Sequence, residues 1–220
     1  MDGAQGPFTL RVMTSGPGYR RWNIRVSQIE CSNPSRAPAN CLQYHTGASG
    51  MFQSFNYEST RPLSETLLTQ QTMNLPREAT YFNNMDYTIC FRKEVGFCTQ
   101  TYQVNTSVVP MEITEAPPAP AAQSPFDLRV YGAAGVTRCP FDYLLLDGVR
   151  YCGARLNPNA HANYLDTDAP VIDRGSGPFI ARFVSNERHV GRGFMIGFQQ
   201  NPCGSRLPVE QFAVTSGRRR

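Results

Sequence analysis

Seven cysteines in a chain of 220 residues constrain this fold more than any other feature. Six of them fall into three close pairs, about ten residues apart, and none has the Cys-x-x-Cys spacing of a zinc site. Close pairs between strand-like segments favour local disulfides, each contributing about 2–3 kcal/mol, whereas buried free thiols would not fall into pairs. The predicted bonds are Cys31–Cys41, Cys90–Cys98 and Cys139–Cys152, with Cys203 left over.

Disulfides persist in oxidising compartments, so the cysteines predict an extracellular, secreted protein. Asn105 begins an Asn-Thr-Ser sequon and is the predicted glycosylation site. The first seven residues have neither the basic nor the apolar region of a signal peptide, so we expect a mature or truncated chain. No run approaches the ~18 apolar residues of a membrane helix, and no membrane span is expected.

The apolar segments are short and alternate with polar residues, as half-buried strands do, and Gly, Pro and Asn separate them. Many short strands with turn signals indicate an all-β, antiparallel sandwich. Tyr143 to Leu146 is expected to be a deeply buried strand that ends in a turn at Asp147-Gly148. The other predicted strands are 8–12, 22–27, 51–57, 87–92, 98–104, 126–131, 179–184 and 194–200.

The charge and motif content excludes several functions. The net charge is +4, and three of these charges are the terminal residues Arg218 to Arg220, so the nearly neutral body does not indicate nucleic-acid binding. No Gly-x-Ser-x-Gly elbow, His-Glu-x-x-His helix or phosphate-binding loop is present. We therefore expect no catalytic residues and no enzymatic activity.

A repeat sets the predicted domain boundaries. Gly6 to Cys31 and Gly177 to Cys203 both open with Gly-Pro-Phe and share Arg, aromatic, Ile, Gln and Cys at matching offsets. If this hairpin closes a domain, residues 1–46 are the last hairpin of a preceding similar domain plus a joint, and 47–204 form a complete domain. The alternative is two ordinary hairpins of similar composition.

Three stretches interrupt or follow the strand pattern. Residues 59–84 are polar and are expected to form a surface insertion, and the Pro- and Ala-rich residues 115–125 form a tether or exposed loop. Residues 205–220 form a basic C-terminal tail, which is either a solvated charged end or a dibasic processing site.

The sequence resembles the CUB domain family, in particular tandem CUB-like secreted proteins of arthropods. The segments that carry the resemblance follow one another in the family's order: 50–57, 86–92, Cys139-Pro-Phe-Asp-Tyr-Leu144, Arg150-Tyr-Cys-Gly153, and 177–186 with Gly193-Phe194. The resemblance implies a jelly-roll-like β-sandwich that acts outside the cell as a non-catalytic module binding proteins or glycans. The alternatives are a self-assembling matrix or coat component, hence a homo-oligomer, and an accessory domain of a secreted protease.

The resemblance also implies a calcium site, which this chain retains only in part. Many members hold Ca²⁺ with three loop carboxylates; Asp142 matches one, Asn186 replaces another with a neutral oxygen, and the third has no counterpart. Calcium needs six to eight oxygen ligands, so we expect no cofactor, with calcium at Asp142 and Asn186 as the alternative. Asp166, Asp168 and Asp173 form a second acidic cluster, which turn-forming aspartates explain more simply than calcium.

Two further expectations concern binding. Tyr19, Arg20, Arg21 and Trp22 are the densest cluster of aromatic and basic residues and the candidate binding site, with ordinary strand packing as the alternative. Cys203 is expected either to bond to a cysteine beyond Arg220 or to bridge to another chain, because no cysteine follows it.

Overall fold

The computed structural model describes residues 6–7, 9–15, 23–57, 80–104, 111, 113, 132–163, 165–188 and 190–204. The chain divides into two compact units, Met1–Arg36 and Ala37–Arg220. Cys41–His45, within the predicted joint, is a strand of the second unit. The predicted 115–125 loop, the tail, the strand at 126–131 and residues 58–79 of the insertion lie outside the described residues.

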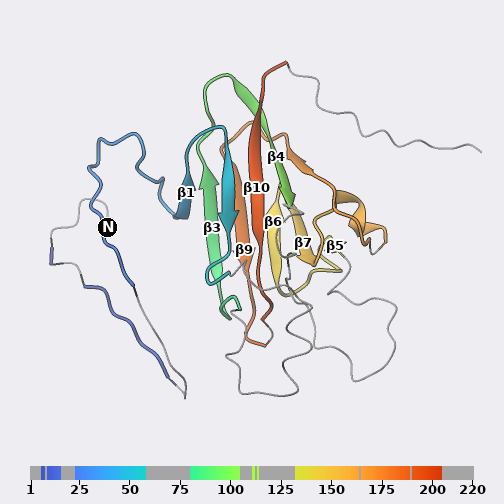
Figure 1. The fold of residues 1–220 in the computed structure, drawn as a ribbon, viewed down its shortest axis with the longest axis horizontal. Helices are drawn as coiled ribbons and strands as arrows, with labels where there is room; N and C mark the ends of the chain where they lie inside the picture. Colours follow the sequence, from blue (N-terminus) through green and yellow to red (C-terminus); the bar gives the residue numbers. More distant parts are fainter. Residues whose placement is uncertain are drawn as a thin grey trace, which may run out of the picture. The chain divides into compact units, whose positions relative to one another are not determined.

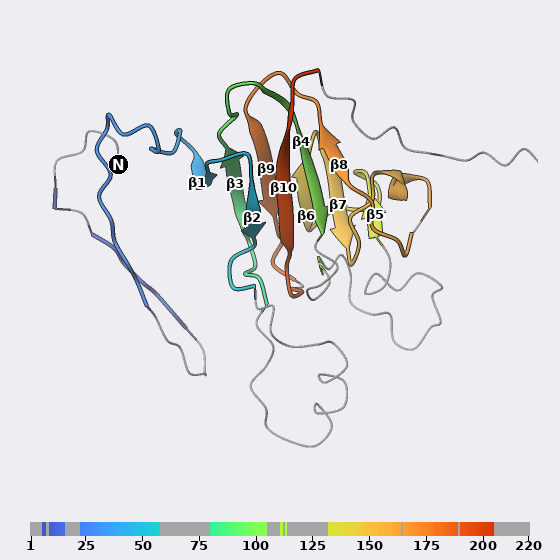
Figure 2. The same cartoon turned by 45° about the horizontal axis from the view of Figure 1, so that its top comes forward.

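The described residues of the second unit form ten strands and one short 3-10 helix at Pro158–His161. One sheet has the order β1-β3-β9-β6-β7-β5, and the other has the order β2-β10-β4-β8. Figure 2 shows β10 and β4 of the four-stranded sheet lying in front of β9 and β6. The strands are β1 (Cys41–His45), β2 (Ser49–Gln53), β3 (Asp86–Phe91), β4 (Phe97–Val104), β5 (Gly132–Ala134), β6 (Tyr143–Leu146), β7 (Val149–Gly153), β8 (Val171–Asp173), β9 (Phe179–Val184) and β10 (Met195–Pro202).

The predicted all-β sandwich is confirmed, and all strand pairs are antiparallel except β1 with β3. The predicted strands at 143–146 and 179–184 match β6 and β9 residue for residue. Asp147 and Gly148 have φ values of +46° and +76°, which form the predicted tight turn. The sequence prediction missed β1, β5, β7 and β8, which are short strands without clear alternation.

The predicted closing hairpin is wrong, because β9 and β10 lie in different sheets. β9 pairs with β3 and β6, whereas β10 pairs with β2 and β4. The two strands are consecutive in the chain but have different neighbours, and the segment between them crosses from one sheet to the other. Figure 1 shows β9 and β10 among the strands of the sandwich rather than at its margins.

Aromatic side chains between the two sheets form the core. Phe91 of β3 packs against Phe52 of β2, Tyr102 of β4 and Phe198 of β10, with ring centroids 4.7–5.7 Å apart. These contacts arise because alternate residues of each strand point to the same side, so one face of each sheet is apolar. Edge and tilted ring geometries of this kind stabilise a core beyond the area that they bury.

The observed disulfides differ from two of the three predicted bonds. The predicted Cys139–Cys152 bond is confirmed, whereas Cys31–Cys41 and Cys90–Cys98 are wrong. The structure instead joins Cys41 to Cys90 and Cys98 to Cys203, and Cys31 is exposed and free. Cys203 therefore needs neither a partner beyond the C-terminus nor a bridge to another chain.

Strand pairing explains the observed bonds. β1 runs parallel to β3, which brings the Cα atoms of Cys41 and Cys90 to 5.7 Å. β10 runs antiparallel to β4, which brings Cys98 and Cys203 to 4.8 Å. Both Cα distances lie within the range that a disulfide spans. Proximity in the sheets, rather than in the sequence, therefore decides the pairing.

We expect the Cys98→Ala/Cys203→Ala variant to lose about 4 kcal/mol of unfolding free energy, because this bond closes a loop of 105 residues. Both cysteines are exposed, so their removal leaves no cavity. Urea denaturation measures the loss. The matched control is Val95→Ala, which shortens a side chain that is 99% exposed and is expected to leave the urea midpoint unchanged; equal midpoints for all three proteins would contradict the prediction.

Candidate functional site

The carboxyl group of Asp142 is fully buried at one end of the sandwich and bonds to two other segments. The Tyr81 hydroxyl donates to its Oδ2 at 2.7 Å, and the Asn186 backbone N–H donates to its Oδ1 at 2.7 Å. Asp142 precedes β6, Tyr81 precedes β3 and Asn186 follows β9. One carboxyl group thus holds together the ends of three neighbouring strands.

Further hydrogen bonds fix the same end. The Tyr81 N–H donates to the Gly191 carbonyl at 3.0 Å, and the Ser185 hydroxyl donates to the Phe82 carbonyl at 2.7 Å. The Asn84 N–H donates to the Asn186 carbonyl at 2.9 Å. The segments 80–85, 185–188 and 190–191 are therefore positioned by these hydrogen bonds.

The structure brings the two predicted calcium ligands together, but as hydrogen-bond partners of each other. Both Asp142 oxygens accept hydrogen bonds, and the Asn186 Oδ1 accepts from the Arg188 N–H at 2.8 Å. Among the described residues, no group of three or more His, Cys, Asp or Glu side chains could hold a metal ion. These residues do not fit calcium, which needs several carboxylates. We assign Asp142 a structural role.

The second acidic cluster is likewise engaged within the chain. The Asp168 carboxylate accepts from Arg155 Nη1 at 2.9 Å and from the Leu156 N–H at 3.1 Å. The Asp173 carboxylate is buried and accepts from the Gly175 N–H at 2.8 Å, as in a turn. Asp166 is exposed. The three aspartates therefore shape a loop and do not converge.

Three large exposed apolar side chains belong to residues that adjoin, in the chain, the residues bonded at this end. Phe82 is 52% exposed and Phe141 is 55% exposed, and each adjoins one partner of that bond in the chain. Val190 is 37% exposed and precedes Gly191, which accepts from Tyr81. We call Phe82, Phe141 and Val190 the Tyr81 end. It presents apolar side chains on a hydrogen-bonded frame.

Sequence reasoning missed Tyr81 and Phe82, because both lie in the stretch expected to be a surface insertion. The signal available was the aromatic pair itself, since two adjacent aromatics are unusual in a polar loop. Tyr81 is instead 2% exposed and among the largest buried side chains.

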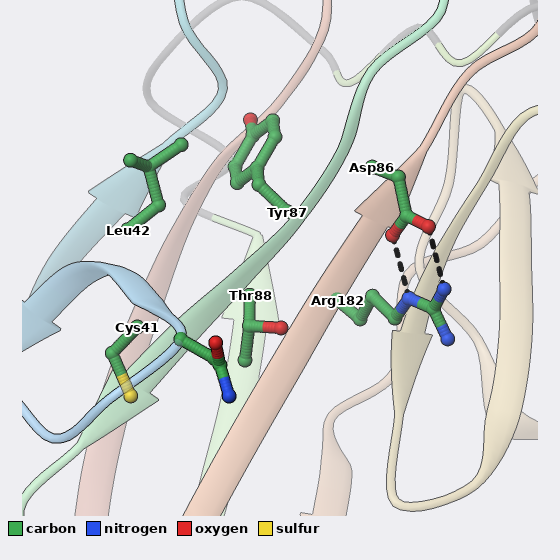
Figure 3. Close-up of a pocket in the computed structure, with 7 residues that line it drawn as sticks. Cys41, Leu42, Asp86, Tyr87, Thr88 and Arg182 are labelled. Carbon is green, nitrogen blue, oxygen red and sulfur yellow. Dashed lines mark hydrogen bonds and ion pairs between the residues drawn. The ribbon is translucent and has the colours of Figure 1, made fainter.

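A shallow depression of about 510 Å³ lies on the outer face of the six-stranded sheet, beside β1 and β3. Figure 3 shows the Arg182 guanidinium joined to the Asp86 carboxylate by two hydrogen bonds, which measure 2.7 and 2.6 Å. Hydrogen bonding to Arg182 lowers the pKa of Asp86. Each charge in the depression therefore already has its counter-charge, so this surface offers a ligand little electrostatic attraction.

The other predicted site residues and the three histidines have separate positions. Tyr19 to Trp22, the Asn105 sequon and His189 lie outside the described residues. His45 is half-buried and stacks on Phe91 at 5.3 Å between ring centroids, and burial lowers the pKa of its imidazole. His161 is exposed, and its Nδ1 lies 2.9 Å from the Pro158 carbonyl oxygen. The two described histidines serve packing and turn geometry.

The family model of the animal CUB domain matches residues 38–201, well over half of the chain. The chain belongs to the animal CUB domain family. CUB domains are extracellular protein-interaction modules and are generally not catalytic, and the disulfides fit that setting. The matched region agrees with the second unit, which begins at Ala37. None of the described helices is long and apolar enough to cross a membrane.

Comparison with solved structures gives 24 similar chains, of which three are described here. The CUB1-EGF-CUB2 domain of human MASP-1/3 is 13% identical with a TM-score of 0.40, covering 73% of this chain and 42% of that one. The full extracellular region of zebrafish Gpr126/Adgrg6 is 14% identical with a TM-score of 0.40, covering 74% and 15%. The MASP-1 CUB2 domain bound to Ca²⁺ is 14% identical with a TM-score of 0.37, covering 72% and 98%. No curated protein matches the sequence.

We expect Tyr81→Phe to lower the unfolding free energy of this CUB domain by about 2 kcal/mol, because it removes a hydrogen bond to a buried carboxyl group. Urea denaturation measures the change. The control is Tyr143→Phe, which keeps the ring 4.0 Å from the Arg150 guanidinium and should cost less than about 0.5 kcal/mol. Equal losses in the two variants would show that the Tyr81 hydroxyl does not matter.

Asp147 supplies a pH-dependent prediction. Loss of solvation, followed by the neighbouring Asp173 carboxylate, raises the pKa of Asp147, with Arg174 opposing this. Because the folded-state pKa is raised, the ionised form of Asp147 lowers the stability of the fold. This loss of stability is absent below the ordinary range near pH 4, and it develops as the pH rises through the folded pKa. Asp147→Asn should therefore raise the melting temperature more at pH 7 than at pH 3. The exposed Asp166→Asn serves as control, and a pH-independent gain at position 147 would refute this origin.

Proposed function

We propose that this CUB domain is an extracellular, non-catalytic binding module that contacts a partner protein through the Tyr81 end. The single observation that carries the proposal is the exposure of Phe82, Phe141 and Val190 around a buried hydrogen bond. Aromatic side chains are enriched among the residues that dominate binding energy. Apolar side chains that are exposed at one place, rather than singly, mark interaction sites.

Rigidity supports the proposal. The bonds from Tyr81 to Asp142 and to Gly191 hold the backbone around the exposed side chains before any partner arrives. A surface that is already ordered loses less conformational entropy on binding, so more of the contact energy appears as affinity. The other exposed apolar residues lack this arrangement; Val95, for example, is 99% exposed in the turn between β3 and β4.

The residues present favour apolar contact over metal-dependent contact. The Asp142 carboxylate, which could have attracted a cation or a basic side chain, is buried and hydrogen-bonded. The exposed charges nearby, Glu187 and Arg188, have opposite signs and lie 3.9 Å apart. We therefore expect binding to be little affected by chelators and only weakly dependent on salt.

The test compares immobilised wild-type protein with Phe82→Ser/Phe141→Ser and with Val95→Ser as the matched control. Val95 lies at the opposite end of β3 and is equally apolar and more exposed. Each is incubated with extracellular fluid from the source, with and without chelator, and bound proteins are quantified by isotope-labelled mass spectrometry. We expect at least one protein whose capture falls about tenfold in the double variant only, since two aromatic contacts contribute about 1.4 kcal/mol or more.

Equal capture by all three proteins would overturn the proposal, as would capture that chelator abolishes. If the depleted protein is the chain itself, the Tyr81 end mediates self-association, and sedimentation of the wild type measures that state. If capture is lost after enzymatic deglycosylation of the fluid, the partner is a glycan and the proposed protein contact is wrong.

A further inference from the structure

The first unit contains a sequence counterpart of the last two strands of the CUB domain. Residues 6–13 align with 177–184, and 20–31 align with 192–203, with one residue fewer in the turn between them. Thr9 to Met13 thus corresponds to β9, and Asn23 to Glu30 corresponds to β10. Cys31 corresponds to Cys203.

The alternation of apolar residues is shared, but their burial is opposite. The β9 and β10 residues that face the core are fully or almost fully buried: Ala181 0%, Phe183 0%, Ile196 0% and Phe198 4%. Their counterparts in the first unit are largely exposed: Leu10 66%, Val12 49%, Ile24 51% and Val26 78%. The first unit therefore carries two core-facing stripes with no core against them among the described residues.

The pairing of β9 and β10 shows which neighbours their counterparts in the first unit would require. In the CUB domain these strands bond to four other strands and not to each other. The described residues 9–15 and 23–30 form no strand and are drawn as extended chain in Figure 1. A strand like β9 needs neighbours equivalent to β3 and β6. A strand like β10 needs neighbours equivalent to β2 and β4.

Two further residues of the first unit, Gln28 and Cys31, also match residues of β10 and its end. Gln200 is buried in β10, where its side chain donates to the Arg92 carbonyl at 2.7 Å and accepts from the Glu94 N–H at 2.9 Å. Gln28 occupies the matching position in the first unit. Cys203 bonds to Cys98 on β4, whereas Cys31 is free and exposed. A cysteine on a β4-like strand is therefore what Cys31 lacks.

We propose that residues 9–31 are the last two strands of a second CUB-type sandwich. Their partner is a segment of the same polypeptide, N-terminal to Gly6, that supplies the strands equivalent to β2, β3, β4 and β6 and a cysteine that bonds to Cys31. This inference is independent of the Tyr81 end.

A second copy of this chain is a poorer partner. The place that residues 9–31 would occupy in the CUB domain is already filled by β9 and β10, whose core-facing side chains are buried. The Cys98–Cys203 bond fastens β10 to β4, so an exchange between copies would require breaking a disulfide. An upstream segment fits the order of the fold, in which the neighbours of β9 and β10 precede them in sequence.

The test begins with disulfide mapping of the native protein, purified from its source with free thiols blocked by N-ethylmaleimide. Trypsin releases Cys31 in the peptide 26–36, which holds no other cysteine. We expect this peptide to be linked to one whose sequence is absent from residues 1–220, and the reduced polypeptide to exceed 24.5 kDa. Three results would each overturn the proposal. They are labelling of Cys31 by the maleimide, a link between two copies of 26–36, and a link from Cys31 to another cysteine of this chain.

A pair of variants in the native-length secreted polypeptide provides a second measurement. Val26 corresponds to the buried Phe198, whereas Ile29 corresponds to Asn201, which is half-exposed. We expect Val26→Asp to lower the secreted yield or the resistance to trypsin at Arg25 by at least about fivefold, because it places a charge in a core, and Ile29→Asp to leave both nearly unchanged. Equal tolerance of the two substitutions would contradict the assignment.

Discussion

Contact between two apolar sheet faces is the constraint on which the rest of this structure depends. A β-strand with one apolar face is not stable alone in water, and here the rings of Phe52, Phe91, Tyr102 and Phe198 meet across the two sheets. The position of Cys98 beside Cys203 follows from the pairing of β4 with β10 within one of these sheets. The hydrogen-bonded loops at the Tyr81 end follow from the sheet packing, because they connect strands whose positions the core has already set.

Strands with strict alternation could be predicted from the sequence, because alternation reports directly on a half-buried face. Tyr143–Leu146 and Phe179–Val184 were predicted with their observed bounds. Gly132–Ala134 could not be, because a three-residue strand of small residues carries no period and exists only through its pairing with β7. Local sequence likewise cannot report that β1 runs parallel to β3, which is a contact between distant segments.

The disulfides and the candidate site show the same limit. Close spacing identified Cys139–Cys152, whose bond closes a local loop, but failed for Cys98 and Cys203, which strand order brings together from 105 residues apart. The structure joins Asp142 and Asn186, the two residues named from the family's pattern, by a hydrogen bond. Their role was not predictable, because it depends on the Tyr81 hydroxyl, which arrives from a segment that had no strand signal.

The central positions of β9 and β10 have a consequence for how the protein is made. Each sheet receives one of its interior strands from residues 179–202, near the end of the chain. During synthesis from the N-terminus, the earlier strands emerge with their core faces uncovered and cannot close into a sandwich. Closure, and the Cys98–Cys203 bond with it, therefore waits until translation has passed Cys203. Until then the nascent domain exposes the aromatic side chains that the complete sandwich buries.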